Sequence, residues 1–107
     1  MDLLNLELRS QELQAIFEEI LGSRNVYYNP PASVQMKYPA IVFSRARIDK
    51  KTANNAAYML SHRYEVTVID SDPDSDYIGA ILSLPTCTFD RHFVSDNLHH
   101  NSFTLYY

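Results

Sequence analysis

The sequence is poor in the residues from which several common kinds of site are built. Its 107 residues include one cysteine, Cys87, two glycines and no tryptophan. A single cysteine excludes an internal disulfide framework and is typical of a reducing compartment. Since Gly22 and Gly79 are the only glycines, the chain has no glycine-rich loop whose backbone N–H groups would cradle a nucleotide phosphate.

Long apolar runs and an excess of positive charge are missing as well. No run approaches the roughly 20 apolar residues of a membrane-spanning helix, and residues 1–9 lack the basic start and apolar run of a signal peptide. We therefore expect a cytosolic protein, or one assembled in a cytosol, with no membrane contact. The net charge of −4 argues against a general nucleic-acid binder.

One short stretch is nevertheless basic. It contains Arg45, Arg47, Lys50 and Lys51. We interpret it as a solvated strand end and loop, and a local basic patch is the alternative.

What is present is the composition of one small globular domain. Hydrophobic residues make up 46% of the chain and charged residues 21%, which argues against disorder. A chain of this length forms one domain with a modest core, so contacts between subunits would add to its stability.

Two segments have helical signals. In Ser10–Leu21 the apolar residues recur at the spacing of one buried helix face: Leu13, Ile16, Phe17, Ile20 and Leu21. Ser10 is the expected N-cap and Gly22 the expected C′ residue. Residues 1–9 are apolar but weakly patterned, and we expect an extension of the helix or an arm that precedes a single domain over residues 10–107.

The second helix is expected to begin at Asp72-Pro73, an N-cap followed by proline at the first helical position. Asp74 and Asp76 would lie in its first turn. Its inner face would be formed by Ile78, Ile81 and Leu82.

Strand signals fill most of the remaining chain. We expect strands at Asn25–Tyr28, from Ala40 toward Ile48, and at Tyr58–Asp70, with a polar loop or long hairpin tip over Asp49–Ala57. Within the last of these strands, Tyr64, Val66, Val68 and Asp70 alternate with their neighbours. The order α, β, β, β, α, β, β predicts an α+β fold with two helices against a mostly antiparallel sheet.

Residues 84–107 predict a hairpin that ends the chain. Cys87, Phe89, Arg91 and Phe93 alternate with Thr88, Asp90, His92 and Val94, and a turn at Ser95–Asn97 precedes a second run, Ser102–Tyr107. We expect this last strand to be paired in a sheet or covered by another subunit, because a bare aromatic strand invites aggregation.

Three groups of residues were weighed as chemical sites. Asp70, Asp72, Asp74 and Asp76 resemble the start of a calcium loop, but Ser75 and Ile81 stand where that loop needs glycine and glutamate. His92, His99 and His100, with Asp90, Asp96 and Cys87 nearby, lack the ligand spacing of a zinc site, and we expect hydrogen bonds instead. Cys87 alternates with Phe89, so we expect a small buried hydrophobe rather than a nucleophile. We predict no catalytic, cofactor-binding or metal-binding residue.

Arg91 is the charged residue with the most informative neighbours. The alternation places it on one face with Phe89 and Phe93. Two interpretations stay open: an ion pair within the chain at the sheet edge, and a contact with another subunit.

Several segments, taken in order, resemble a known family. They are Val26-Tyr27-Tyr28 with Pro30-Pro31, Tyr38–Val42, Tyr64–Asp70 with Asp72–Ser75, Leu84-Pro85, Phe89–His92, and Asn97-Leu98 through Phe103–Tyr107. This pattern, from about Leu13 to the end, is similar to the small tail-terminator or tail-completion proteins of long-tailed bacteriophages and prophages.

The resemblance implies a non-enzymatic structural protein of the virion tail or neck, assembled in the host cytoplasm. Such a protein forms a ring, typically a hexamer, on the last ring of the tail tube. It stops tube growth and joins the tail to the head connector, while DNA passes through the lumen without specific binding. The terminal strand and the hairpin at Asp49–Ala57 are the expected contacts with other subunits and the tube. Two alternatives remain: another head–tail connector or stopper, and an unrelated interaction module or metal-dependent hydrolase using the histidines and aspartates.

Overall fold

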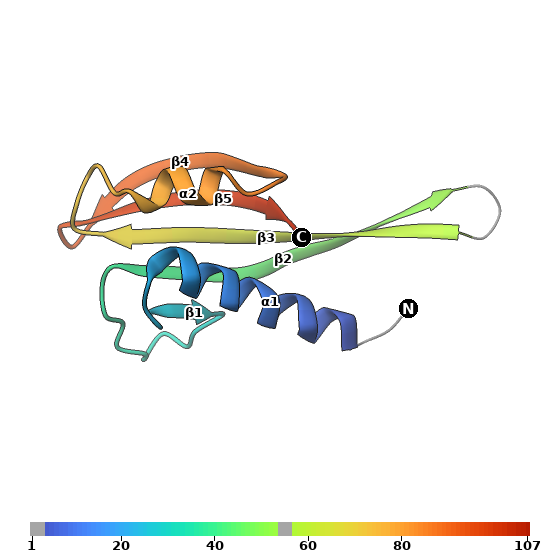
Figure 1. Ribbon diagram of the computed structural model, residues 1–107, viewed down its shortest axis with the longest axis horizontal. Coiled ribbons are helices and arrows are strands. Elements are labelled where there is room, and N and C mark those ends of the chain that lie inside the picture. Colours follow the sequence, from blue (N-terminus) through green and yellow to red (C-terminus); the bar gives the residue numbers. More distant parts are fainter. Residues whose placement is uncertain (1–3, 54–56) are drawn as a thin grey trace.

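The computed structural model describes residues 4–53 and 57–107, with side-chain surroundings for residues 8–50 and 61–107. In chain order the elements are α1 (Leu4–Leu21), β1 (Val26–Tyr28), β2 (Ala40–Ala53), β3 (Ala57–Asp70), α2 (Tyr77–Leu82), β4 (Cys87–Ser95) and β5 (Leu98–Tyr106). This is the predicted order, and the chain forms a single α+β domain (Figure 1).

The strands form one five-stranded sheet in the order β1-β2-β3-β5-β4. β1 pairs with β2 in parallel, and every other pair is antiparallel. β5 therefore lies inside the sheet, between β3 and β4, and its pairing satisfies the backbone on both sides. The expectation that the terminal strand is paired in a sheet is confirmed. The strand offers no free backbone edge to another subunit, because β4 takes the edge position.

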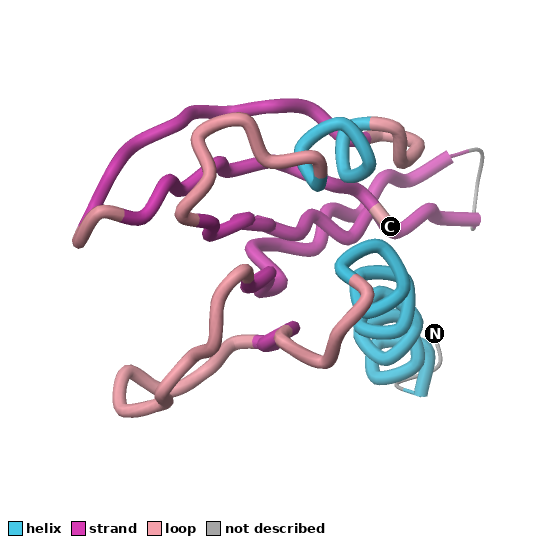
Figure 2. The backbone as a smooth tube through the Cα atoms, turned by 60° about the vertical axis from the view of Figure 1, so that its left-hand side comes forward, coloured by secondary structure: helices cyan, strands magenta, loops and turns pink. Residues whose placement is uncertain are grey.

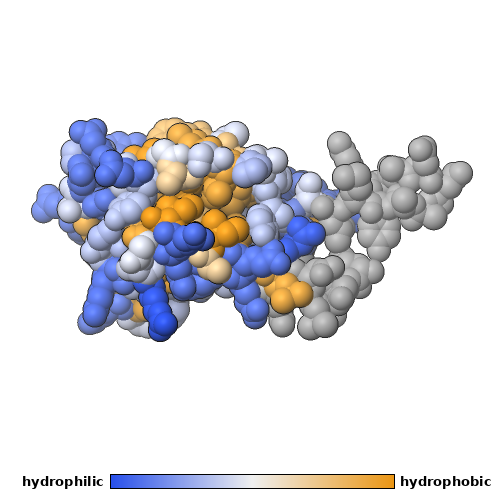
Figure 3. All heavy atoms as spheres, in the orientation of Figure 1, coloured by the Kyte–Doolittle hydropathy of each residue, from blue (hydrophilic) through white to orange (hydrophobic). Residues whose placement is uncertain are grey.

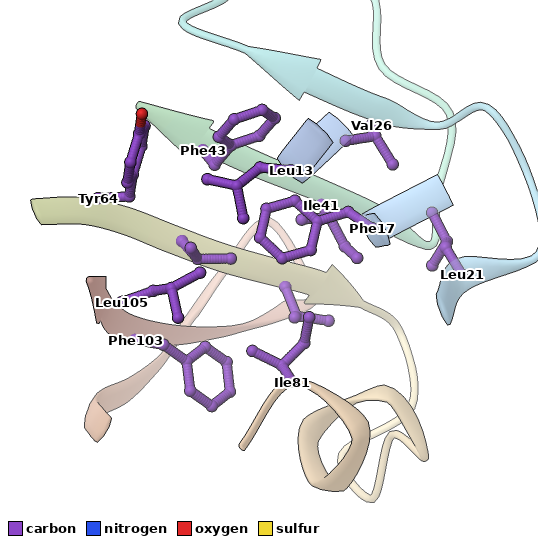
Figure 4. Close-up of a cluster of buried hydrophobic side chains, with 12 residues drawn as sticks. Leu13, Phe17, Leu21, Val26, Ile41, Phe43, Tyr64, Ile81, Phe103 and Leu105 are labelled. Atoms are coloured by element: carbon purple, nitrogen blue, oxygen red, sulfur yellow. The ribbon is translucent and has the colours of Figure 1, made fainter. Parts of the chain in front are cut away.

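Both helices cover the same face of the sheet (Figure 2). Register places Phe43 beside Val66, and Val66 beside Phe103, so one stripe of side chains crosses three strands toward the helices. These residues form one cluster with α1 and α2 (Figure 4), whose members are Leu13, Phe17, Leu21, Val26, Ile41, Phe43, Tyr64, Val66, Val68, Ile81, Phe103 and Leu105. Burying a side chain such as Phe17 contributes about 1.5–3 kcal/mol, so this cluster is the main source of stability.

The predicted inner face of α1 is confirmed. Leu13 and Phe17 have no exposed surface, and Ile16 and Ile20 pack beside them. Gly22 has a φ of +73° and its N–H donates to the carbonyl of Glu18, as expected of a helix-ending glycine. The prediction of Ser10 as N-cap is wrong, because the helix continues back to Leu4 and takes in most of the segment at residues 1–9.

The second helix begins later than predicted, at Tyr77, with Asp76 as its N-cap residue. Asp72 instead accepts a hydrogen bond from the backbone N–H of Asp74, and Asp70 accepts one from the N–H of Asp72. These side chains satisfy local backbone donors in turns, which is the alternative that aspartate offers to a helix. Of the predicted inner face, Ile81 is buried, while Leu82 is exposed.

The most conspicuous feature of the shape is an arm formed by β2 and β3. β1 pairs with β2 at Ile41–Phe43, and β5 pairs with β3 only from Arg63 onward. Residues 48–53 and 57–62, which we call the arm, therefore form a two-stranded ribbon, paired from Ile48–His62 out to Ala53–Ala57, with no third strand in register among the described residues. The arm projects well beyond the body in Figure 1, and the molecule measures 52 × 24 × 23 Å. The predicted polar loop is thus mostly strand; residues 54–56 lie outside the described residues.

Candidate interaction surfaces

The arm is the first candidate surface. Six residues on each strand extend about 20 Å at the usual rise of a β-strand. Ile48, at its base, is 40% exposed. Among residues 4–53 and 57–107 no third strand pairs with the arm. A two-stranded ribbon by itself is only marginally stable in water, so the arm is suited to receive support from another molecule.

His62 and the chain end join the arm to the body. The backbone N–H of Tyr107 donates to the carbonyl of His62, and the Tyr107 hydroxyl donates to a Glu12 carboxylate oxygen at 2.6 Å. His62 is 2% exposed, and its Nδ1 has no hydrogen-bond partner among the described residues. Burial lowers the pKa of His62, and the positive charges of Arg9 and Arg45 lower it further.

The second candidate surface is β4, the outer strand on the side opposite β1. Every residue from Thr88 to Ser95 is exposed. Phe89, Phe93 and Val94 are 45%, 37% and 56% exposed. A long edge strand with exposed hydrophobic side chains is a template for pairing with another chain.

A bulge interrupts β4 and corrects the predicted alternation. Phe89 pairs with Phe103, but Arg91 pairs with Ser102, so one extra residue lies at Asp90. Phe89 consequently points toward the helix-covered face, while Arg91 and Phe93 lie on the opposite, open face. The prediction that Phe89, Arg91 and Phe93 share a face is wrong, because a bulge shifts the two-residue repeat by one position.

A stack of side chains fixes Phe93 on the open face. The guanidinium carbon of Arg91 lies 5.0 Å from the centroid of the Phe93 ring, and the His100 ring stacks on Phe93 at 4.6 Å. Among the described residues, Arg91 forms no ion pair. The interpretation of Arg91 as an intrachain ion pair is therefore wrong, and the guanidinium is held against an aromatic face instead.

The neighbouring Asp90 is also tied to the body. Its carboxylate accepts a hydrogen bond of 2.7 Å from the Thr104 hydroxyl. A hollow of about 370 Å³ opens here on the open face, lined by Glu65, Thr67, Asp90, Arg91, Phe93, Ser102 and Phe103. The lining mixes both signs of charge with an aromatic ring.

The histidines of the terminal hairpin form hydrogen bonds, as expected. Nε2 of His92 lies 2.9 Å from Nδ1 of His99, and the two rings stack with their centroids 5.2 Å apart. His100 binds elsewhere, through Nδ1 to the carbonyl of Leu98. No group of three or more metal-ligating side chains converges among the residues described here, and the two histidines form a cross-strand hydrogen bond.

Cys87 packs as predicted against the core. It lies opposite Leu105 in the β4–β5 register and is half-buried. Burial raises the pKa of the Cys87 thiol, and the negative charge of Asp90 raises it further. A raised pKa leaves the thiol protonated near neutral pH, which is the opposite of an activated nucleophile.

The basic stretch is partly neutralised. Arg47 forms an ion pair with Asp49 at 2.6 Å at the base of the arm. The side chain of Lys51 lies outside the described residues. Exposed pairs of this kind contribute little to stability.

A third surface lies on the helix side. Hydrophobic residues gather in the middle of the body, between hydrophilic margins (Figure 3). An apolar groove of about 350 Å³ runs between α1 and the segment before β4, lined by Leu13, Ile16, Leu84, Pro85, Thr86, Leu105, Tyr106 and Tyr107. Sequence periodicity did not reveal this groove, because it is formed by segments that are distant in the chain.

Comparisons with known proteins do not assign these surfaces. None of the helices that the structure describes is long and apolar enough to cross a membrane. The sequence matches no protein-family model and no curated protein.

Proposed function

We propose that this protein is a structural component of the tail or neck of a bacteriophage or prophage virion. In this role it forms a ring, expected to be a hexamer, at the head-proximal end of the tail tube. The ring terminates tube growth and joins the tail to the head. The proposal rests on the resemblance of the chain, from about Leu13 to the end, to tail-terminator proteins and on the shape of the subunit.

The observation that carries the proposal is the arm. A ring requires a heterologous contact, in which one part of a subunit fits a different part of the next. The arm projects far from the body as a two-stranded ribbon, so it is positioned to reach a neighbouring subunit or the tube. A neighbour could supply the third strand that does not pair with the arm among the described residues.

The charge of the chain fits a channel for DNA. At a net charge of −4 per subunit, a ring of several copies would repel phosphates rather than bind them, so DNA would pass without adhering. The role requires no catalysis, metal or cofactor. The proposed partners are further copies of the chain, the tail tube protein and the head–tail connector or stopper, in a virion assembled in the host cytoplasm.

The test adds purified protein to purified tail tubes and images the tube ends by electron microscopy. A ring of density on the tube end is the expected result. Density only on the portal of the head, and not on the tube end, would assign the protein to the connector. Binding to neither the tube end nor the portal would overturn the proposal.

The role of the arm is tested separately with a shortened variant, in which residues 49–61 are replaced by Asn-Gly between the paired residues Ile48 and His62. The body should keep its fold, as measured by circular dichroism, but lose ring formation at tube ends. Leu82→Lys is the matched control, since it removes an exposed apolar side chain on α2 away from the arm. Normal ring formation by the shortened variant would refute the role given to the arm.

A further inference from the structure

We propose that two free copies of this protein pair through β4, antiparallel, about a two-fold axis that passes beside Phe93. The contact joins two five-stranded sheets into one continuous sheet. It is isologous and closes at two copies, so it goes beyond the proposed ring, which needs heterologous contacts, and does not rest on it.

The backbone of β4 offers a free edge. β5 pairs with one side of the strand over residues 87–95, and no strand lies on the other side among the residues described. The strand has nine residues and contains neither proline nor lysine, two of the residues that commonly protect an edge. Its protective features are the bulge at Asp90 and the charges of Asp90 and Arg91, all at or before the start of the regular segment 91–95.

The turn that follows β4 determines which backbone groups face outward. Asp96 and Asn97 have φ of 53° and 62°, which is the geometry of a two-residue type I′ hairpin. Ser95 and Leu98 are then the hydrogen-bonded closing pair, and hydrogen-bonded and non-hydrogen-bonded pairs alternate from there. The N–H and C=O groups of His92 and Val94 therefore point away from β5, toward the free edge.

This pattern supports one symmetric register. With the axis beside Phe93, His92 of one copy lies opposite Val94 of the other and both exchange N–H···O bonds, which gives four bonds in all. Phe93 then faces its own counterpart in a non-hydrogen-bonded pair, where side chains approach most closely. A register centred on His92 would pair the bulged residue Asp90 with Val94 of the other copy. A register centred on Val94 would pair His92 with Asp96, which belongs to the turn.

The side chains also match in this register. Residues 91–95 lie beyond the bulge and alternate regularly, so each residue meets a partner on the same face of the joined sheet. Arg91 lies opposite Ser95, and no like charges are directly opposed within the five residues. On the open face two Phe93 rings meet, each already held by Arg91 and His100, so pairing loses little side-chain freedom.

Five residues from each copy make a small contact compared with stable interfaces. The dimer is therefore expected to dissociate on dilution. Sedimentation equilibrium over a wide concentration range should show reversible monomer–dimer exchange. A monomer at every accessible concentration would overturn the proposal.

Cysteine crosslinking tests the register. In a Cys87→Ser background, Phe93→Cys places two thiols on the axis, in reach of a disulfide, and mild oxidation should link two chains. Val94→Cys is the matched control: it is more exposed, but its counterpart lies about 8 Å away, beyond the roughly 7 Å limit for a disulfide. Phe93→Cys should crosslink at least tenfold faster, and equal rates would refute the register.

Val94→Pro tests the backbone bonds. It removes an N–H that points away from β5, and proline is tolerated on an edge strand when the lost donor faces outward. The variant should keep its circular dichroism spectrum and sediment as a monomer at concentrations where the unmodified protein dimerises. Undiminished dimerisation would overturn the proposal.

Discussion

Tyr64 carries the sharpest prediction about stability. Its side chain is fully buried in the middle of β3, and its hydroxyl has no hydrogen-bond partner among the described residues. The ring packs in the main core, with its centroid 6.4 Å from that of Phe43. Tyr64→Phe removes the hydroxyl and leaves the ring in place.

The expected effect is a gain in stability. A buried hydroxyl without a partner costs about 1–3 kcal/mol, since it has lost its bonds to water. Tyr64→Phe should therefore raise the free energy of unfolding by about 1–2 kcal/mol. For a domain of this size each kcal/mol raises Tm by about 4–8 °C.

Urea denaturation measures this effect, with the m-value unchanged between the two proteins. Tyr27→Phe is the matched control, because the Tyr27 hydroxyl oxygen accepts a hydrogen bond from the backbone N–H of Lys37 at 3.1 Å. That variant should lose about 0.5–1 kcal/mol. A loss of stability in Tyr64→Phe as large as that in the control would show that the Tyr64 hydroxyl is bonded.

Three further predictions concern the core, the pH dependence and the backbone. Phe17→Ala should lower the free energy of unfolding in urea by about 3–5 kcal/mol, because it empties a fully buried site; a loss below about 1 kcal/mol would contradict this packing. Because the pKa of His62 is lowered in the folded protein, the unfolded chain protonates this side chain more readily. The free energy of unfolding should therefore fall as the pH drops below about 6.5, by at most about 1.4 kcal/mol per pH unit. In urea titrations at several pH values, His62→Gln should remove this part of the dependence of the free energy of unfolding on pH. An unchanged pH dependence would show that another group is responsible. Thr86 has a φ of 61°, which strains a β-branched residue. Thr86→Gly and Thr86→Ala both lose the hydrogen bond from the Thr86 hydroxyl to the carbonyl of Tyr106. In thermal denaturation the glycine variant should be more stable than the alanine variant by about 1 kcal/mol, because glycine adopts this φ without strain.

Local signals predicted the elements and most of the core. The spacing of Leu13, Phe17 and Leu21 places one face of α1 inward, and the alternation of Tyr64, Val66 and Val68 does the same for β3. These patterns are readable because each depends on a repeat within a few residues. Helix starts are less predictable: Ser10 and Asp72 have the right chemistry for caps, but α1 begins at Leu4 and α2 at Tyr77, after local turns.

The candidate surfaces depended on features that leave little trace in sequence. The bulge at Asp90 places Arg91 and Phe93 on the face of the sheet opposite to Phe89, whereas strict alternation would place all three together. A single extra residue in one strand has no distinctive sequence signal. Of the two alternatives for Asp49–Ala57, a polar loop and a long hairpin tip, the pairing of β2 with β3 supports the hairpin. Asp49 and the polar residues after it resemble a loop, so their composition does not distinguish the two.

The sequence by itself determined the class of the molecule: one small α+β domain, its element order, the stripe of apolar residues that must be buried, and the lack of disulfide or phosphate-loop chemistry. Tertiary structure alone decided that β5 lies inside the sheet and β4 at its edge, and that the arm has no third strand among the described residues. It also decided that Tyr64 and His62 are buried with a polar side-chain atom that has no hydrogen-bond partner in the part of the chain the structure describes. The physical reason is range. Side-chain periodicity is local, whereas strand order and burial depend on contacts between residues far apart in the chain.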